Sequence, residues 1–185
     1  MTGASTLAWM TLLLPLASAA VITLGTLKNH RHSAHLSIGA ILGAFICSLL
    51  LFLSASSGES NLTWIAIGDF TATIGVKLDR LSALMLLVVT GVGALIHWYS
   101  QGYMEGDRSY ARYFASLSLF SFSMLGIVLA TNLMQMFIFW ELVGVSSYLL
   151  IGFWHERPAA ADACKKAFIT NRLGDFGFLI GIIIV

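Results

Sequence analysis

The sequence has few charged residues for its length. Of its 185 residues, 10% are Asp, Glu, Lys or Arg, whereas soluble domains contain about 25%. Hydrophobic residues make up 58%, and the mean hydropathy is +0.86. This composition excludes an ordinary soluble domain and is typical of a protein that crosses a membrane several times. The formal net charge of +1 at pH 7 gives no indication of nucleic-acid binding, and none is expected.

Cysteine and cofactor motifs are also scarce. Cys47 and Cys164 sit in or beside apolar runs, without a CxxC or a Cys/His cluster, so neither a disulfide nor a metal site is predicted. The sequence contains no GxGxxG, Walker loop, GxSxG or HExxH motif. His30, His32 and His35 share one basic segment, which we interpret as a solvated loop. We therefore expect this chain to bind no cofactor and no metal.

Apolar runs predict an all-α polytopic membrane protein with about six transmembrane helices. We expect one membrane domain over residues 1–185. The predicted helices cover residues 7–27, 36–54, 81–98, 113–130, 133–154 and 161–185. The long polar stretch 55–77 contains two short predicted strands, Trp64–Ile67 and Thr73–Leu78, around Gly68 and Asp69. We expect a small β-hairpin there, at the membrane surface.

The distribution of Lys and Arg predicts an orientation. The loops after the first, third and fifth helices, with the start of the sixth, carry Lys28, Arg31, Arg108, Arg112, Arg157, Lys165 and Lys166. The opposite side carries Lys77 and Arg80. We therefore expect the first side to be cytoplasmic and the N-terminus to lie outside. The chain stops at Val185 inside an apolar run, which predicts the N-terminal part of a longer chain.

Glu141 is an acid inside the apolar run 133–154. At 1.5 Å per residue it lies about 12 Å along the helix, near the middle of a hydrocarbon layer about 30 Å thick. A charge there costs about 2.5–3.5 kcal/mol on insertion scales. Such residues therefore usually face protein or water, and they usually have a functional role. Helical periodicity puts Gly144, Tyr148 and Gly152 on the same face, where small residues let another helix approach.

The last predicted helix carries charges on one face. Lys165, Arg172 and Asp175 fall within an arc of about 80°, and Gly174, Gly177 and Gly181 lie roughly opposite. Asp175 can pair with Arg172 at i,i+3, and such a salt bridge would also explain both residues structurally. Lys165 could instead lie at the membrane interface, with its stem against apolar surface and its ammonium in water.

His97 ends the third predicted helix, where it could connect bulk water with the interior or simply sit at the interface. Together these residues predict a line of buried acids and bases that transfers protons or Na⁺, with no redox cofactor implied. The alternative is a structural role, in which the buried pairs hold helices together.

Two segments carry a family resemblance. FWELVGVSSYLLIGFWHERP (Phe139–Pro158) and KKAFITNRLGDFGF (Lys165–Phe178) resemble the large antiporter-like membrane subunit of proton-pumping NADH:quinone oxidoreductase, respiratory complex I. LDRLSALMLLVVTGVGALIHWYSQGYM (Leu78–Met104) resembles the same subunit, which is subunit L in bacteria and subunit 5 in mitochondria.

The resemblance implies that Glu141 is a key proton-channel acid and that Arg172, Asp175 and His97 match residues of the family. Helical spacing alone makes Tyr148, two turns along from Glu141, and Lys165, on the charged face of the last helix, our candidates for supporting residues. The family's partner lysine for this acid lies on a later helix that the sequence does not contain. It implies that NADH, quinone, FMN and iron–sulfur clusters belong to other parts of the complex, and that other membrane subunits are the partners. A bacterial inner membrane is the expected location. Multi-subunit Na⁺/H⁺ antiporters have a related large subunit, and a non-pumping structural or assembly fragment is the other alternative.

Overall fold

A computed structural model describes residues 3–26, 30–67 and 70–184. Within these ranges the helices are α1 (Gly3–Val21), α2 (His30–Leu53), α3 (Arg80–Tyr103), α4 (Tyr110–Val128), α5 (Leu133–Ile151) and α6 (Pro158–Ile184). A π-helical segment, Ile22–Thr26, continues α1. The strands β1 (Gly58–Ile67) and β2 (Phe70–Leu78) form an antiparallel hairpin between α2 and α3. In the described part of the chain, six helices are long and apolar enough to span a membrane.

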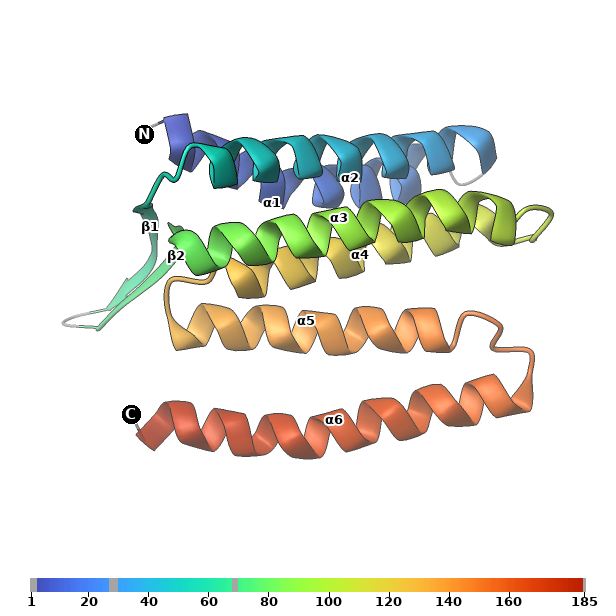
Figure 1. Cartoon of the computed structure of the whole chain (residues 1–185). Coiled ribbons are helices and arrows are strands. Elements are labelled where there is room, and N and C mark those ends of the chain that lie inside the picture. Colours follow the sequence, from blue (N-terminus) through green and yellow to red (C-terminus); the bar gives the residue numbers. More distant parts are fainter. Residues whose placement is uncertain (1–2, 27–29, 68–69, 185) are drawn as a thin grey trace.

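The helices lie side by side, and helices joined by a short connection run antiparallel, with the hairpin at one end of the bundle (Figure 1). Helix α4 packs against α1, α2, α3 and α5, whereas α6 packs chiefly against α5 among the described elements. The number of buried residues agrees with this difference in packing. Helix α4 has eleven, whereas the buried residues of α6 are Cys164 and Asp175. A carboxylate is therefore one of the most protected side chains on the most peripheral helix.

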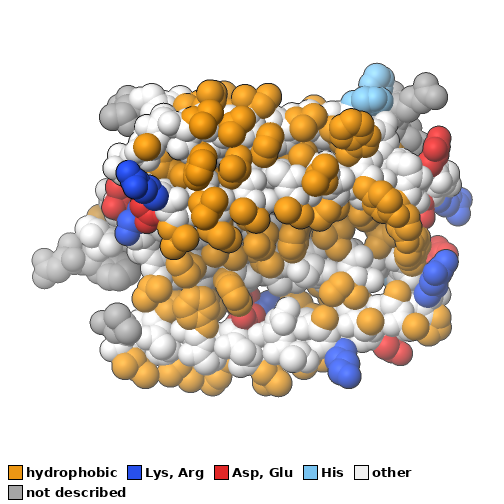
Figure 2. All heavy atoms as spheres, in the orientation of Figure 1, with side chains coloured by type: hydrophobic (Ala, Val, Ile, Leu, Met, Phe, Trp, Pro, Cys, Tyr) orange, Lys and Arg blue, Asp and Glu red, His pale blue; other side chains and the backbone are white. Residues whose placement is uncertain are grey.

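Apolar clusters fill both ends of the bundle. At the hairpin end, α1, α2, α3 and α4 bury side chains against β2. At the other end, the π-helical segment, α2, α4 and the segments after α3 and α5 meet. Figure 2 shows hydrophobic side chains covering the bundle between its two ends, where most of the charged side chains in this view gather. This banding is the pattern expected of a bundle whose sides face hydrocarbon.

The hairpin is fastened to the start of α5. Gln135 is 2% exposed; its Oε1 accepts from the Gly75 N–H at 3.0 Å, and its Nε2 donates to the Gly75 carbonyl at 2.8 Å. Asn132 caps α5 by accepting from the Gln135 N–H at 2.8 Å, and its Nδ2 donates to the Thr73 carbonyl at 2.9 Å. One polar turn therefore ends α4, begins α5 and binds β2.

Several predicted boundaries were wrong. Helix α2 begins at His30, so the basic segment interpreted as a loop is helical from that residue. Helix α3 runs to Tyr103 rather than residue 98, because its polar last turns are held between helices: Ser100 Oγ lies 3.0 Å from Tyr113 Oη. Hydropathy marks where a helix is apolar, and a helix continues past that limit when its polar groups find partners.

The second half of the chain differs from the prediction in the same way. Helix α4 begins three residues before the predicted start, with Tyr110 buried. Helix α5 ends at Ile151 rather than residue 154, and Arg112 Nη2 donates to the Phe153 carbonyl at 3.0 Å, which fixes the turn outside the helix. Helix α6 begins at Pro158, because proline is well suited to the first helical position.

The hairpin is confirmed, but its strands are longer than predicted. They begin at Gly58 and Phe70 and pair from Gly58↔Leu78 to Ile67↔Phe70, with an irregularity between Thr63 and Ile65. The predicted turn at Gly68 and Asp69 lies outside the described residues. Asp79 then caps α3, since its carboxylate accepts from the Ser82 N–H at 2.7 Å.

Asp107 joins two connections at the end of the bundle remote from the hairpin, and it predicts a pH effect. Its carboxylate accepts from Trp154 Nε1 at 2.9 Å and from the Ser109 N–H at 2.7 Å. The Trp154 bond chiefly, then the Ser109 bond and the charge of Arg112, hold the pKa of Asp107 below its usual 3.8. A lowered pKa contributes stability above the usual value, and that contribution is lost as pH falls through the lowered one.

We therefore expect the thermal midpoint of the wild-type chain in detergent to fall more steeply below about pH 4 than that of Asp107→Asn. Near neutral pH, Asp107→Asn should unfold at the lower temperature, and the two curves should converge on acidification. Circular dichroism across a pH series measures both. Parallel curves over the whole series would contradict this role for Asp107.

Candidate proton-transfer site

Helices α5 and α6 meet through aromatic and small side chains. The rings of Phe137 and Trp140 pack edge-on against Phe178, with centroids 5.6 and 6.1 Å apart. Further along, Tyr148 packs against Phe168 at 5.5 Å. Gly152 allows the close approach predicted for it: a Cβ there would lie 2.9 Å from Cys164 Sγ.

The charged residues Glu141, Arg172 and Asp175 come together in this seam. Arg172 Nη1 pairs with Glu141 Oε2 across the two helices, and it lies 3.7 Å from Asp175 Oδ2 on its own helix. Figure 2 shows acidic and basic side chains side by side between α5 and α6, away from both ends. The predicted i,i+3 pair is confirmed, and the pair with Glu141 is one that sequence analysis did not identify.

Burial differs among the three side chains. Asp175 is 7% exposed, Glu141 is 23% exposed and Arg172 is 41% exposed. The Arg172 guanidinium also lies over the Phe168 ring, 4.7 Å from its centroid. One cation is therefore shared by two carboxylates, and an aromatic face adds a third attraction to its position.

Trp140 completes the site and was missed by sequence analysis. Its Nε1 donates to Asp175 Oδ1 at 2.9 Å. The indole therefore contacts one oxygen of the Asp175 carboxylate, and Arg172 lies nearest the other, Oδ2. The signal was present in the sequence, since Trp140 immediately precedes Glu141, but a tryptophan in an apolar run gives no indication of its hydrogen-bond partner.

The two residues predicted in support lie elsewhere. Tyr148 lines a groove near the end of α5, and Lys165 lies on the same groove with its side chain 67% exposed. Lys165 Nζ is 3.9 Å from Asp162 Oδ1, and that partner is 80% exposed. The structure therefore separates Lys165 from Arg172 and Asp175, with which it shares a helical face.

His97 was predicted at the end of its helix, and that placement was wrong. It lies six residues before the end of α3 and is 1% exposed. Its Nδ1 is 2.7 Å from the Gly93 carbonyl, and its ring lies 6.5 Å from that of Phe114 on α4. Its Nε2 is buried without a hydrogen-bond partner among the described residues. A proton-shuttle role for His97 stays a prediction.

The glycine face of α6 is open within the described residues. A Cβ at Gly174, Gly177 or Gly181 would meet nothing within 4 Å. Arg172 and Asp175, on the charged face of the same helix, contact α5. The charged face therefore points into the protein as predicted, whereas the glycine face contacts no described residue.

The arrangement suits proton transfer. Two carboxylates can each hold a proton, and the cation between them stabilises whichever carboxylate it contacts. Among the residues that the structure describes, no group of three or more His, Cys, Asp or Glu side chains is arranged to bind a metal ion.

Two family models match the chain. Residues 64–114 match the N-terminus of chain 5 of NADH-ubiquinone oxidoreductase (complex I), and residues 130–185 match the transmembrane family of NADH:quinone oxidoreductase and Mrp antiporter. The second match contains the whole charged site.

Curated relatives agree with these matches. The chain is 48% identical to NAD(P)H-quinone oxidoreductase subunit 5 of the Zygnema circumcarinatum chloroplast, over 95% of its own length and 26% of the relative. It is 46% identical to NAD(P)H-quinone oxidoreductase chain 5 of Synechocystis sp., over 96% of its own length and 28% of the relative. The chain thus spans just over a quarter of the length of these relatives.

A solved structure shares the fold. The Mrp complex from Dietzia sp. superposes with a TM-score of 0.79 at 22% identity, over 94% of this chain and 18% of that one. The six apolar helices and the family match over residues 130–185 define an integral membrane protein of the antiporter-like class, with an ion-paired carboxylate between two of these helices. The chain belongs to the family of subunit 5 of the NADH:quinone oxidoreductases.

Proposed function

We propose that the chain is part of a proton-translocating membrane subunit of an NADH- or NAD(P)H-quinone oxidoreductase. Quinone reduction elsewhere in the complex drives proton transfer through its buried charges. The observation that carries the proposal is the shared cation: Arg172 pairs with Glu141 on one helix and lies beside Asp175 on the other. The relatives are named as NAD(P)H-quinone oxidoreductase subunits, which supports quinone reduction as the reaction that drives proton transfer.

Each residue has a definite task in this mechanism. Glu141 holds the transferred proton. While Arg172 contacts Glu141, the carboxylate keeps a counter-ion; when Arg172 moves to Asp175, Glu141 is left uncompensated in a low-dielectric layer and takes up a proton. Trp140 keeps one oxygen of Asp175 occupied. His97 would pass protons between α3 and the rest of the path after a change in its surroundings, since it is buried here.

The chain's own residues supply no redox chemistry in this proposal. The nicotinamide, the flavin, the iron–sulfur clusters and the quinone belong to other subunits, and the partners are the other membrane subunits of the complex. We further propose a bacterial cytoplasmic membrane, with the basic connections inside and the N-terminus outside, from the distribution of Lys and Arg.

A Na⁺/H⁺ antiporter subunit is a second candidate, favoured by the structural similarity to the Mrp complex. A structural or assembly role, in which the ion pair only joins α5 and α6, is the third. One vesicle experiment separates all three. The parent complex is reconstituted, and proton movement is followed with a pH-sensitive dye, first with NADH or NADPH plus quinone and then with a Na⁺ gradient alone.

Proton movement that requires both nicotinamide and quinone supports the proposed function, and comparison of NADH with NADPH identifies the donor. Proton movement driven by Na⁺ without either would select the antiporter. If the complex that lacks this subunit moved as many protons per electron pair as the intact one, the structural role would be selected.

The Trp140 bond predicts a measurable change in stability. Trp140→Phe removes one hydrogen bond to a buried carboxylate and keeps most of the aromatic packing, so we expect the free energy of unfolding to fall by about 2 kcal/mol. Trp98→Phe is the matched control, because Trp98 is 70% exposed and should change stability little. SDS titration of the chain, followed by circular dichroism, measures both; equal effects would contradict the role of the indole.

A further inference from the structure

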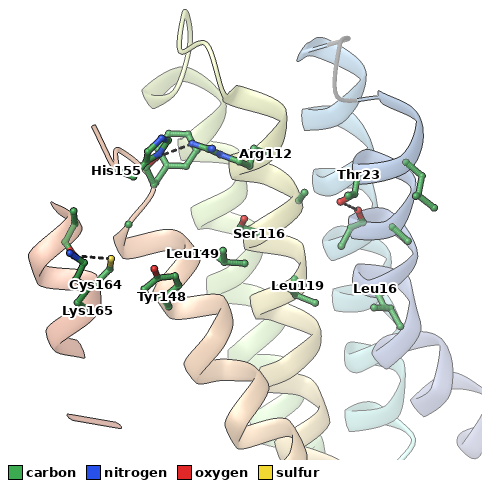
Figure 3. Close-up of a pocket in the computed structure, with 17 residues that line it drawn as sticks. Leu16, Thr23, Arg112, Ser116, Leu119, Tyr148, Leu149, His155, Cys164 and Lys165 are labelled. Atoms are coloured by element: carbon green, nitrogen blue, oxygen red, sulfur yellow. Dashed lines mark hydrogen bonds between the residues drawn. The ribbon is translucent and has the colours of Figure 1, made fainter. Parts of the chain in front are cut away.

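A groove opens on the side of the bundle at the end remote from the hairpin. It has a volume of about 980 Å³, within the range of pockets that hold organic ligands. Its walls come from α1, α4, α5 and the start of α6, and Figure 3 shows Leu16, Leu119 and Leu149 around its apolar part. The charged site does not line it, so the groove requires its own explanation.

The dimensions of the groove match one leaflet of a membrane. Its lining extends from Leu16 on α1 to Leu24 on the π-helical segment, and on α4 from Arg112 to Leu119. At 1.5 Å per residue these stretches measure about 10–12 Å. Half of a hydrocarbon layer is about 15 Å thick, so the groove accommodates an acyl chain that descends from the interface.

Basic residues stand at the mouth of the groove. Arg112 and His155 line it near the connecting segments, and Lys165 lines it further along α6 (Figure 3). Arg112 is held in place, because it donates to the Phe153 carbonyl and its guanidinium lies 5.1 Å from the Phe153 ring centroid. A guanidinium has five N–H donors, so most of them are left for another acceptor.

Lys165 adds a second positive charge, and its ammonium is only weakly held by other residues. Its contact with Asp162, at 3.9 Å between two well-exposed side chains, is of the kind that contributes little. An ammonium so placed can turn towards a phosphate at the groove mouth. Basic pockets between transmembrane helices are suited to anionic lipid headgroups, each Lys or Arg near the surface contributing about 1 kcal/mol.

We propose that this groove binds an anionic phospholipid. One acyl chain lies against Leu16, Leu119 and Leu149, and the phosphate accepts hydrogen bonds from Arg112 and Lys165. This assigns to Tyr148 and Lys165 a place in a lipid site rather than in the charged cluster. The proposal is independent of the proposed function, since binding requires neither electron transfer nor a proton gradient.

Photo-crosslinking tests the site directly. The parent complex is reconstituted in bilayers that contain equal parts of phosphatidylglycerol and phosphatidylcholine, one of the two carrying a photoreactive acyl chain. We expect phosphatidylglycerol to label peptides 16–24 and 148–153 about fivefold more than phosphatidylcholine does. Lys165→Gln should reduce this preference severalfold.

Lys166→Gln is the matched control, because it removes the same charge from the next residue, which does not line the groove. Ala20→Phe, at an exposed position of the lining, should block labelling while leaving both charges in place. Equal labelling by the two lipids, equal effects of the two lysine variants, or preferential labelling by a photoreactive neutral isoprenoid quinone would each overturn the proposal.

Discussion

Arg172→Leu should destabilise the chain by about 3 kcal/mol, because it leaves two carboxylates without their shared cation inside the bundle. Asp175 would retain the bond from Trp140, while Glu141 would lose its cross-helix partner. Breaking a buried pair from one side costs more than the pair contributes, since the remaining charge is uncompensated. SDS titration of the purified chain measures the change.

A second variant separates the uncompensated charge from any loss of packing. Combining Arg172→Leu with Glu141→Gln and Asp175→Asn removes all three charges and should recover most of the lost stability. Arg108→Leu, at an exposed position in a connecting segment, is the control and should change stability by less than about 0.5 kcal/mol. If the triple variant were as unstable as Arg172→Leu alone, the energetic account of the site would be wrong.

Gln135→Met should have the second large effect, a loss of about 2–4 kcal/mol. Methionine fills similar space but leaves the buried N–H and carbonyl of Gly75 unpaired, and each unpaired buried group costs about 1–3 kcal/mol. Unfolding in SDS measures this loss, and Gln101→Met at a half-exposed position of α3 is the control.

A graded variant identifies the cause. Gln135→Glu keeps an acceptor for the Gly75 N–H and removes the donor to the Gly75 carbonyl. If the two hydrogen bonds contribute separately, this variant should be more stable near neutral pH than Gln135→Met. Should Gln135→Met prove as stable as Gln101→Met, the hairpin would be held by its other contacts.

Sequence patterns predicted the class of fold because hydrocarbon imposes long apolar helices. Boundaries were harder to predict, since polar helix ends depend on partners from other helices. The last turns of α3 continue past the apolar run with Ser100 beside Tyr113, and α5 stops early where Arg112 reaches the Phe153 carbonyl. Such contacts join residues far apart in sequence, and periodicity carries no record of them.

The site was predictable as a set of residue types but not as a geometry. A buried acid in an apolar helix indicates function by its energetic cost alone, which identified Glu141 and Asp175. Helical spacing identified the pair of Arg172 with Asp175, because i,i+3 contacts are local. The pair of Arg172 with Glu141 and the bond from Trp140 depend on how α5 and α6 align, which periodicity does not give. Periodicity put Lys165 on the face of Arg172 and Asp175, and in the structure its side chain is 67% exposed and lies 3.9 Å from Asp162.

The central claim is that Glu141 carries a transferred proton, and Glu141→Gln tests it most directly. The measurement is the number of protons moved per electron pair by the reconstituted parent complex. Glutamine keeps the size of the side chain, and Arg172 keeps Asp175 as a partner, so assembly and quinone reduction should persist. The account predicts fewer protons per electron pair, because an amide does not cycle a proton. An unchanged ratio in a fully assembled complex would contradict it.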